Sequence, residues 1–122
     1  MKKLFILPLL LSLSPLAIAF EGKYECTGND ARTQKPFTLT QILKKTGETY
    51  SLDSRTTEGD VYHGTGIVDK ANNSLSVAAI NPADPKETGI IVFHSKNKDT
   101  LDATWTYLDE KTVVHATCKK MG

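Results

Sequence analysis

The residues best suited to metal or acid–base chemistry in this chain are its three histidines, His63, His94 and His115. Imidazole nitrogens are common zinc ligands, and three of them can hold one zinc ion with a fourth position left open. Each histidine falls on a different candidate strand, and no two are spaced i, i+2 along one strand. This spacing favours ordinary surface histidines, so we expect no metal ion and no cofactor.

His63 is followed by Gly64-Thr65-Gly66, a short run that could form a phosphate-binding loop. A P-loop needs a Lys-Ser or Lys-Thr after its glycines, and a dinucleotide site needs its glycines between a strand and a helix. Here the strand pattern continues through Ile67 and Val68. The glycines are better explained as a strand bend or as close packing against a bulky neighbour such as Trp105.

Two motifs of hydrolytic enzymes are also missing from the chain. Neither a Gly-x-Ser-x-Gly elbow nor a His-Glu-x-x-His zinc motif occurs. The acidic pair Asp109-Glu110 falls in a predicted turn, where solvated carboxylates are common. We therefore expect no catalytic residue and a protein that is not an enzyme.

Aromatic side chains are the better candidates for ligand contacts. Most of them fall within strand patterns and are expected in the core. A subset could line the mouth of a barrel and stack on a small apolar or sugar-like ligand. The candidate ligand-binding residues are Trp105, Tyr107, Tyr62 and His63.

Cys26 and Cys118 are the only cysteines. In a secreted protein they are expected to form a disulfide, since the compartment is oxidising. Such a bond closes a loop of about 90 residues and stabilises the fold by about 4–5 kcal/mol in the chain-entropy model. Neither cysteine lies in a Cys-x-x-Cys redox motif.

The elements that position these residues are predicted to be strands. No stretch after residue 20 shows sustained helical periodicity, while short runs rich in Thr, Val, Ile, Tyr and Phe recur between turn residues. About eight candidate strands result. They are Gly22–Thr27, Pro36–Lys45, Glu48–Ser54, Val61–Asp69, Ser74–Ile80, Thr88–Ser95, Thr100–Tyr107 and Thr112–Lys119.

Alternation along these strands indicates which side chains face the core. In the Thr100–Tyr107 strand, one face carries Leu101, Ala103, Trp105 and Tyr107. Tyr24 and Cys26 share a face of the first strand, and Cys118 lies in the last. A disulfide joining first and last strands fits a sheet that curls until its edges meet. The predicted fold is a small antiparallel up-and-down β-barrel, with a two-sheet β-sandwich as the alternative.

Three longer connections could carry binding residues: Gly28–Lys35, Arg55–Asp60 and Asn81–Glu87. The third begins Asn81-Pro82-Ala83-Asp84-Pro85, which cannot form a central strand because its two prolines lack backbone donors. A tight turn at Ala71-Asn72-Asn73 is expected between the fourth and fifth strands.

Residues 1–19 have the pattern of a secretory signal peptide. Met1-Lys2-Lys3 precedes a short apolar run that ends in Ala17-Ile18-Ala19. We expect cleavage after Ala19, a single barrel domain at residues 20–122, and a bacterial protein that is periplasmic or secreted.

Cleavage also changes the net charge. The whole chain has 15 Lys and Arg against 14 Asp and Glu, so loss of Lys2 and Lys3 leaves 13 against 14, a net charge of −1. This mixed balance offers no basic stripe for nucleic acid and no polybasic segment for lipid. We expect a monomer that binds neither nucleic acid nor membranes.

Three segments carry a resemblance: the Gly22–Asp30 segment, Gly64-Thr65-Gly66-Ile67 with Leu75-Ser76-Val77-Ala78, and Leu101-Asp102-Ala103-Thr104-Trp105-Thr106. They resemble small secreted bacterial β-barrel proteins of uncharacterised function with a G-x-Y-x-C-x-G-x-D opening and a later L-x-x-x-W strand. Gly22-Lys23-Tyr24 is also distantly similar to the opening Gly-x-Trp of calycins, the lipocalins and avidins. The resemblance implies an extracytoplasmic barrel and, for calycins, small hydrophobic ligands or partner proteins.

The sequence thus predicts a non-enzymatic binding protein whose ligand is unknown. The alternatives are a calycin-like small-molecule binder and an inhibitor of a secreted enzyme such as a lysozyme or protease. A small-molecule binder predicts an apolar cavity beside Trp105, and an inhibitor predicts a rigid, projecting loop.

Overall fold

A computed structural model describes residues 20–30 and 33–122, so the predicted signal peptide lies outside the described residues. These described residues form eight strands and one short 3-10 turn, η3 (Lys70–Asn72). The strands are β1 (Gly22–Asn29), β2 (Pro36–Thr46), β3 (Thr49–Thr56), β4 (Val61–Asp69), β5 (Ser74–Asn81), β6 (Asp84–Asn97), β7 (Thr100–Tyr107) and β8 (Val114–Lys120). Among the described residues, no helix is long and apolar enough to span a membrane.

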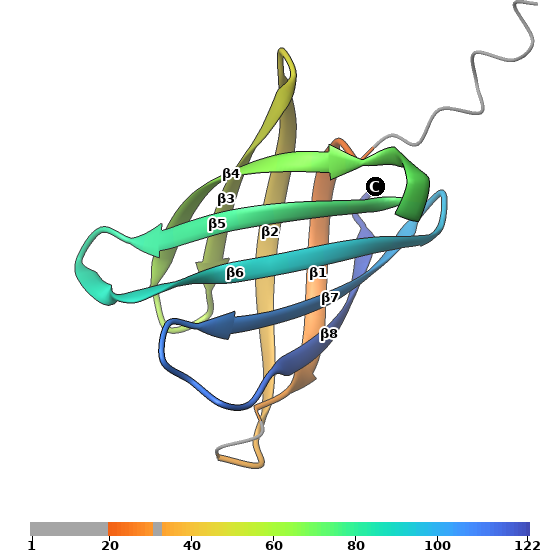
Figure 1. Cartoon of the computed structure of the whole chain (residues 1–122). Coiled ribbons are helices and arrows are strands. Elements are labelled where there is room, and N and C mark those ends of the chain that lie inside the picture. Colours follow the sequence, from red (N-terminus) through yellow and green to blue (C-terminus); the bar gives the residue numbers. More distant parts are fainter. Residues whose placement is uncertain (1–19, 31–32) are drawn as a thin grey trace, which may run out of the picture.

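The strands form one closed antiparallel barrel in chain order, and Figure 1 shows them following one another around it. Each strand pairs with the next, and β1 pairs with β8 to close the ring. The predicted up-and-down barrel is therefore confirmed over the two-sheet sandwich. Closure leaves no unpaired sheet edge, which removes the surface that promotes association between strands.

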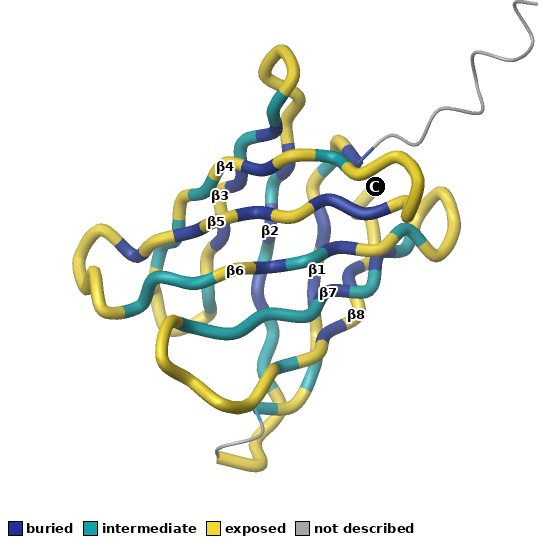
Figure 2. The backbone as a smooth tube through the Cα atoms, viewed as in Figure 1, coloured by how far each residue is buried: buried dark blue, intermediate teal, exposed yellow. Residues whose placement is uncertain are grey.

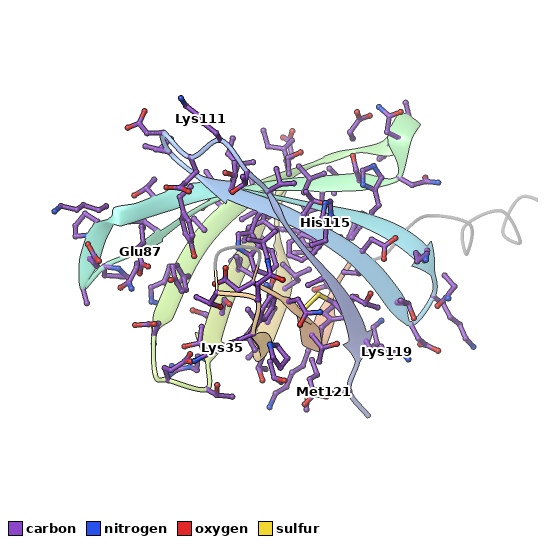
Figure 3. All side chains as sticks on the ribbon, turned by 90° about the horizontal axis from the view of Figure 1, so that it is seen from below. Lys35, Glu87, Lys111, His115, Lys119 and Met121 are labelled. Carbon is purple, nitrogen blue, oxygen red and sulfur yellow. A yellow bond between two sulfur atoms is a disulfide. The ribbon has the colours of Figure 1, made fainter. Side chains whose placement is uncertain are left out.

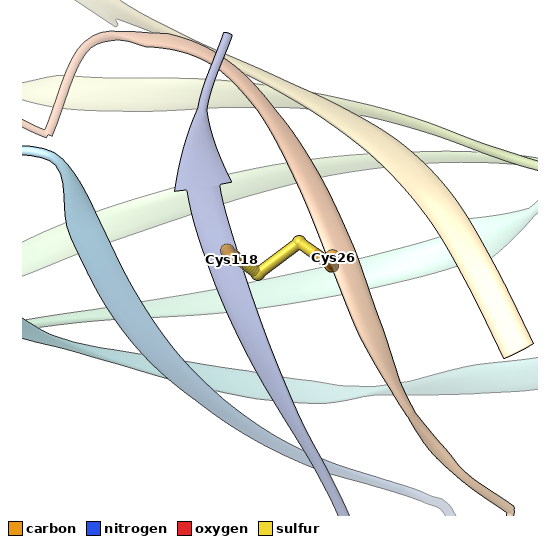
Figure 4. The surroundings of a disulfide bond; sticks show 2 residues. All are labelled: Cys26 and Cys118. Atoms are coloured by element: carbon orange, nitrogen blue, oxygen red, sulfur yellow. A yellow bond between two sulfur atoms is a disulfide. The ribbon is translucent and has the colours of Figure 1, made fainter. Parts of the chain in front are cut away.

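A disulfide crosses the closing seam, as the sequence predicted. Cys26 on β1 and Cys118 on β8 are register partners, and their sulfurs are bonded at 2.01 Å. Figure 4 shows the bond between the two neighbouring strands. Both cysteines are fully buried, so the covalent link lies on the inner side of the barrel.

Alternation places apolar side chains inside, and Figure 2 shows buried and exposed residues following one another along the strands. On β5, Leu75, Val77 and Ala79 are buried while Ser76 and Ala78 are exposed. The same alternation holds on β8, where Ala116 and Cys118 are buried between exposed neighbours. Both strands therefore follow the two-residue period of a strand that has one face in the core.

The two ends of the barrel differ. At one end, the Phe20 ring is fully buried and packs edge-on against Tyr50, with ring centroids 6.1 Å apart. The Tyr24 hydroxyl donates to the Phe20 carbonyl oxygen at 2.9 Å, which fixes the residue that precedes β1. This is the closed end, where β2 turns into β3. The other end, where β3 turns into β4, is the open end.

Gly64 and Gly66 pack closely, although not against Trp105. A Cβ atom on Gly66 would lie 2.7 Å from Cγ2 of Val77, and one on Gly64 would lie 2.7 Å from Cγ1 of the same residue. Val77 lies opposite Gly66 on the neighbouring strand β5, whereas Trp105 belongs to β7. The expected bulky neighbour is therefore wrong, and Val77 takes its place.

Several strand boundaries differ from the prediction by one or two residues, and the largest difference lies at the start of β6. The expected loop Asn81–Glu87 is a tight hairpin, because β6 begins at Asp84 and pairs back to Asn81. The register then shifts so that Ile80 pairs with Thr88, and Pro85 lies in the intervening bulge. A proline there removes no ladder hydrogen bond, which explains why a strand tolerates it. At a smaller change, β8 begins at Val114 instead of Thr112.

The β4–β5 turn lies where it was expected. η3 follows Asp69, whose side chain accepts a hydrogen bond from the backbone N–H of Ala71. Asn73 then adopts the left-handed conformation, with φ 51° and ψ 45°. Asparagine tolerates this conformation better than most residues, so the local sequence favours a reversal at this point.

Candidate functional site

The open end of the barrel leads into a cavity of about 370 Å³. Its walls are mainly aromatic and aliphatic, with polar residues at its depth and charged residues at its rim. The aromatic residues are Phe37, Tyr62, Trp105 and Tyr107, and the aliphatic ones include Leu39, Ala79, Ile91 and Val114. A cavity with an apolar body and a few polar groups has the general character of a small-molecule site.

Three of the four candidate residues meet at this cavity. Trp105 and Tyr107 point inward from β7, and Tyr62 points inward from β4. The Tyr62 and Tyr107 rings are tilted by 31° with centroids 6.5 Å apart. Trp105 instead packs edge-on against Phe37 of β2, at 5.5 Å between centroids. Two aromatic pairs therefore form the walls of the open end.

His63 does not reach the cavity. It follows Tyr62 on β4, and adjacent residues of a strand face opposite sides, so its ring lies outside the barrel. There its Nδ1 contacts the carboxylate of Asp53 on β3, with both side chains about half exposed. The wall of the barrel therefore separates the His63 imidazole from the three aromatic rings with which it was predicted.

The other two histidines are also on the outside. His94 on β6 is exposed, and exposed His115 on β8 lies 3.2 Å from the Thr104 hydroxyl through Nδ1. Across residues 20–30 and 33–122, no group of three or more His, Cys, Asp and Glu side chains could hold a metal ion. The three histidines thus lie at separate positions on the outer surface of the barrel.

A carboxylate is held at the edge of the cavity by two donors. The Tyr62 hydroxyl donates to Oε1 of Glu87 at 3.0 Å, and Nδ2 of Asn81 donates to the same oxygen at 2.9 Å. Burial, followed by the hydrogen bonds to Tyr107 and Glu87, raises the pKa of Tyr62 above its ordinary value. Tyr62 therefore stays a neutral donor, and Glu87 has a fixed orientation.

The deepest part of the cavity is polar. Gln41 is the innermost lining residue on β2 and Ser54 is the innermost on β3, and the two are register partners. Both are buried, at 2% and 4% exposed. Oε1 of Gln41 has no hydrogen-bond partner among the described residues. A buried carbonyl oxygen without a partner is costly, which makes this position unusual in a barrel interior.

Carboxylates predominate at the rim. Asp30 and Lys35 of the β1–β2 connection carry opposite charges, so the excess comes from Glu58, Asp60 and Glu87. Figure 3 shows Lys35, Glu87 and Lys111 on separate segments of the chain at this end. Lys111 is not among the lining residues. The rim is therefore negative where the cavity opens.

The three connections expected to carry binding residues all lie at the open end. The cavity takes Asp30, Thr33 and Lys35 from the first, Thr56, Glu58 and Asp60 from the second, and Glu87 from the third. Ala31 and Arg32 of the first connection lie outside the described residues. The up-and-down order brings these connections together, because every second hairpin turns at the same end.

Sequence reasoning missed the polar residues of the cavity. Gln41 alternates with Leu39 and Leu43 on β2, so a polar residue at an inward position could have been recognised from the period alone. Glu87 was expected only as the last residue of the Asn81–Glu87 connection, and no local pattern indicated its inward position, because it lies in the bulge at the start of β6. Its role depends on a register shift that local sequence patterns do not reveal.

Comparison of the chain with protein-family models and with curated proteins found no match.

Proposed function

We propose that this protein is a secreted or periplasmic, non-enzymatic binding protein that holds a small amphipathic molecule in the open end of its barrel. The observation that carries this proposal is the cavity of about 370 Å³ beside Trp105. Its volume is within the range of about 300–1,000 Å³ common among ligand pockets. Other inward-facing side chains, including Phe20, Leu43, Leu52 and Phe93, belong to the buried hydrophobic core.

The walls support binding of a partly apolar molecule. Four aromatic rings and several aliphatic side chains line the cavity, while polar atoms occupy its depth and rim. This arrangement buries the body of a ligand and fixes its orientation through a few polar contacts. The disulfide supports an oxidising compartment, and with it the proposed location outside the cytoplasm.

The test uses a neutral, environment-sensitive dye, N-phenyl-naphthylamine, and the single tryptophan of the chain. We expect saturable dye binding with energy transfer from Trp105, which lines the cavity. Ala79→Phe fills the cavity from β5 and should lower the dye affinity by about tenfold or more, since the added ring occupies the ligand's space.

The matched control is Ala78→Phe, the same change on the neighbouring residue of β5, which faces outward. Circular dichroism and the disulfide state verify that both variants fold. Equal dye affinity in the two variants, or no saturable binding to the natural protein, would contradict the proposal. Inhibition of a lysozyme or protease by a protein that binds no dye would favour the alternative function.

A further inference from the structure

We propose that the cavity takes a small organic cation that has an aromatic or apolar body and a hydroxyl group at its buried end. This inference rests on the proposed binding function and adds the chemical class of the ligand. The cationic group lies at the acidic rim, the body lies between the aromatic walls, and the hydroxyl reaches Gln41 and Ser54.

The buried end is defined by an unsatisfied polar group. Gln41 lines the cavity and is 2% exposed, and its buried Oε1 has no hydrogen-bond partner among the described residues. A purely apolar ligand would exclude water and leave this oxygen unpaired, which opposes binding. A hydroxyl both donates and accepts, so it can satisfy the carboxamide of Gln41 and the adjacent hydroxyl of Ser54.

The middle of the cavity is suited to a flat or apolar body. Phe37 and Trp105 form one wall with an edge-on contact, and Leu39 and Ile91 line the cavity between the polar depth and the rim. Aromatic rings favour offset or edge-to-face neighbours, so a ligand ring can extend the Phe37–Trp105 pair.

The rim selects for positive charge. Glu58, Asp60 and Glu87 line the opening, and Asp30 and Lys35 offset each other in charge. Among the lining residues this makes four carboxylates against one cation. An anionic ligand would be repelled here, whereas an ammonium group gains charge-assisted hydrogen bonds.

Two features direct the cation toward Glu87. The Tyr62 hydroxyl and the Asn81 amide both donate to Oε1, so the carboxylate is already oriented and its Oε2 atom can accept from a ligand. The rings of Tyr62 and Tyr107 also line the cavity, 6.5 Å apart, and aromatic rings attract cations through their ring electrons. A preorganised acceptor reduces the ordering cost of binding.

The probe is tyramine, which has an ammonium group, an aromatic ring and a phenolic hydroxyl. Three analogues each change one feature: neutral tyrosol replaces the ammonium, phenethylamine lacks the phenolic hydroxyl, and desaminotyrosine is anionic. Titrations followed by Trp105 fluorescence and calorimetry give the affinities. We expect tyramine to bind about tenfold more tightly than tyrosol or desaminotyrosine and several-fold more tightly than phenethylamine. The preference should weaken as salt is added.

Variants assign the two ends of the ligand. Glu87→Gln keeps an acceptor for Tyr62 and Asn81 but removes the charge, so it should lower tyramine affinity about tenfold and leave tyrosol affinity unchanged. Gln41→Met removes the polar atoms at similar volume and should weaken tyramine more than phenethylamine. Ser54→Ala provides a second variant should Gln41→Met fail to fold. Glu48→Gln, at the closed end, is the charge-matched control and should change no affinity.

The outcomes separate this inference from the function on which it rests. Equal or tighter binding of tyrosol or desaminotyrosine, in a protein that still binds the neutral dye, overturns the cationic ligand class and leaves the binding function intact. Unchanged tyramine affinity in Glu87→Gln and Gln41→Met also overturns it. Failure to bind both the dye and all four probes removes the proposed function together with this inference.

Discussion

At the scale of single residues, the character of the cavity depends on which side chain of each adjacent pair faces inward. Tyr62 contributes a neutral hydroxyl and an aromatic face to the open end, whereas His63 beside it contacts Asp53 on the outer surface. The same rule places Gln41 inside, between two leucines on β2. A polar residue at an inward position raises the free energy of the empty barrel, and a ligand can recover that cost.

Tyr24 makes the stability of the closed end depend on pH. Burial, followed by the nearby charges of Tyr50 and Asp99, raises the Tyr24 pKa from 10.0 to about 12. The unfolded chain loses this proton first as pH rises, so the contribution to stability is complete below pH 10 and is lost as pH approaches 12. The full contribution is at most about 3 kcal/mol.

Urea unfolding from pH 7 to pH 11 checks this dependence. Tyr24→Phe removes the ionisable group and the hydrogen bond to the Phe20 carbonyl, so it should cost about 1 kcal/mol at pH 7. It should also reduce the loss of stability above pH 10. The same alkaline loss in Tyr24→Phe as in the natural protein would show that other groups cause it.

At the scale of the elements, the hydrophobic period carried most of the information. The central parts of all eight strands, and the inward faces of β5, β7 and β8, follow from alternation in the sequence. The boundaries were less predictable at Asp84 and Val114, because a bulge and a long connection depend on pairing with distant strands. The inward position of Glu87 was missed for the same reason, whereas the inward positions of Trp105 and Tyr107 follow from alternation along their own strand and were therefore predictable.

The disulfide between β1 and β8 should supply a large part of the stability of the barrel. It links residues separated by 92 positions, and breaking it frees the unfolded chain from a long closed loop. The double change Cys26→Ala with Cys118→Ala should lower the free energy of unfolding by about 4–5 kcal/mol. Urea titration of the purified protein measures this difference.

A neighbouring cross-strand pair provides the control. Thr27 and Thr117 are the next register partners along the same seam, and both face outward. Thr27→Ala with Thr117→Ala should cost about 1 kcal/mol or less, since it removes only an exposed pair. If the cysteine double variant loses as little free energy of unfolding as the threonine double variant, the seam tolerates the absence of the disulfide.

At the scale of the whole molecule, the barrel is asymmetric along its axis. Phe20, Tyr24 and Tyr50 fill the closed end, while the cavity occupies the interior near the open end. The closed half therefore provides most of the packing. The open half contains the cavity and so has fewer interior contacts.

Two phenylalanine variants test this asymmetry. Phe20 is fully buried at the closed end, so Phe20→Ala should cost about 3–5 kcal/mol in urea unfolding. Phe37 is only partly buried at the open end, and Phe37→Ala should cost about 1–2 kcal/mol. If Phe37→Ala lowers the free energy of unfolding more than Phe20→Ala does, the open half contributes more packing energy than the closed half.

The even number of alternating strands has a practical consequence. Phe20 precedes β1 and Gly122 follows β8, and both lie at the closed end, where the backbone N–H of Met121 donates to the carbonyl of Lys23 (Figure 1). A barrel immobilised on a solid support through its carboxyl terminus would point its opening toward the solution. Because Trp105 is the single tryptophan of the sequence, its fluorescence would report on the cavity alone. The surface-bound protein would then serve as an oriented, label-free optical sensor.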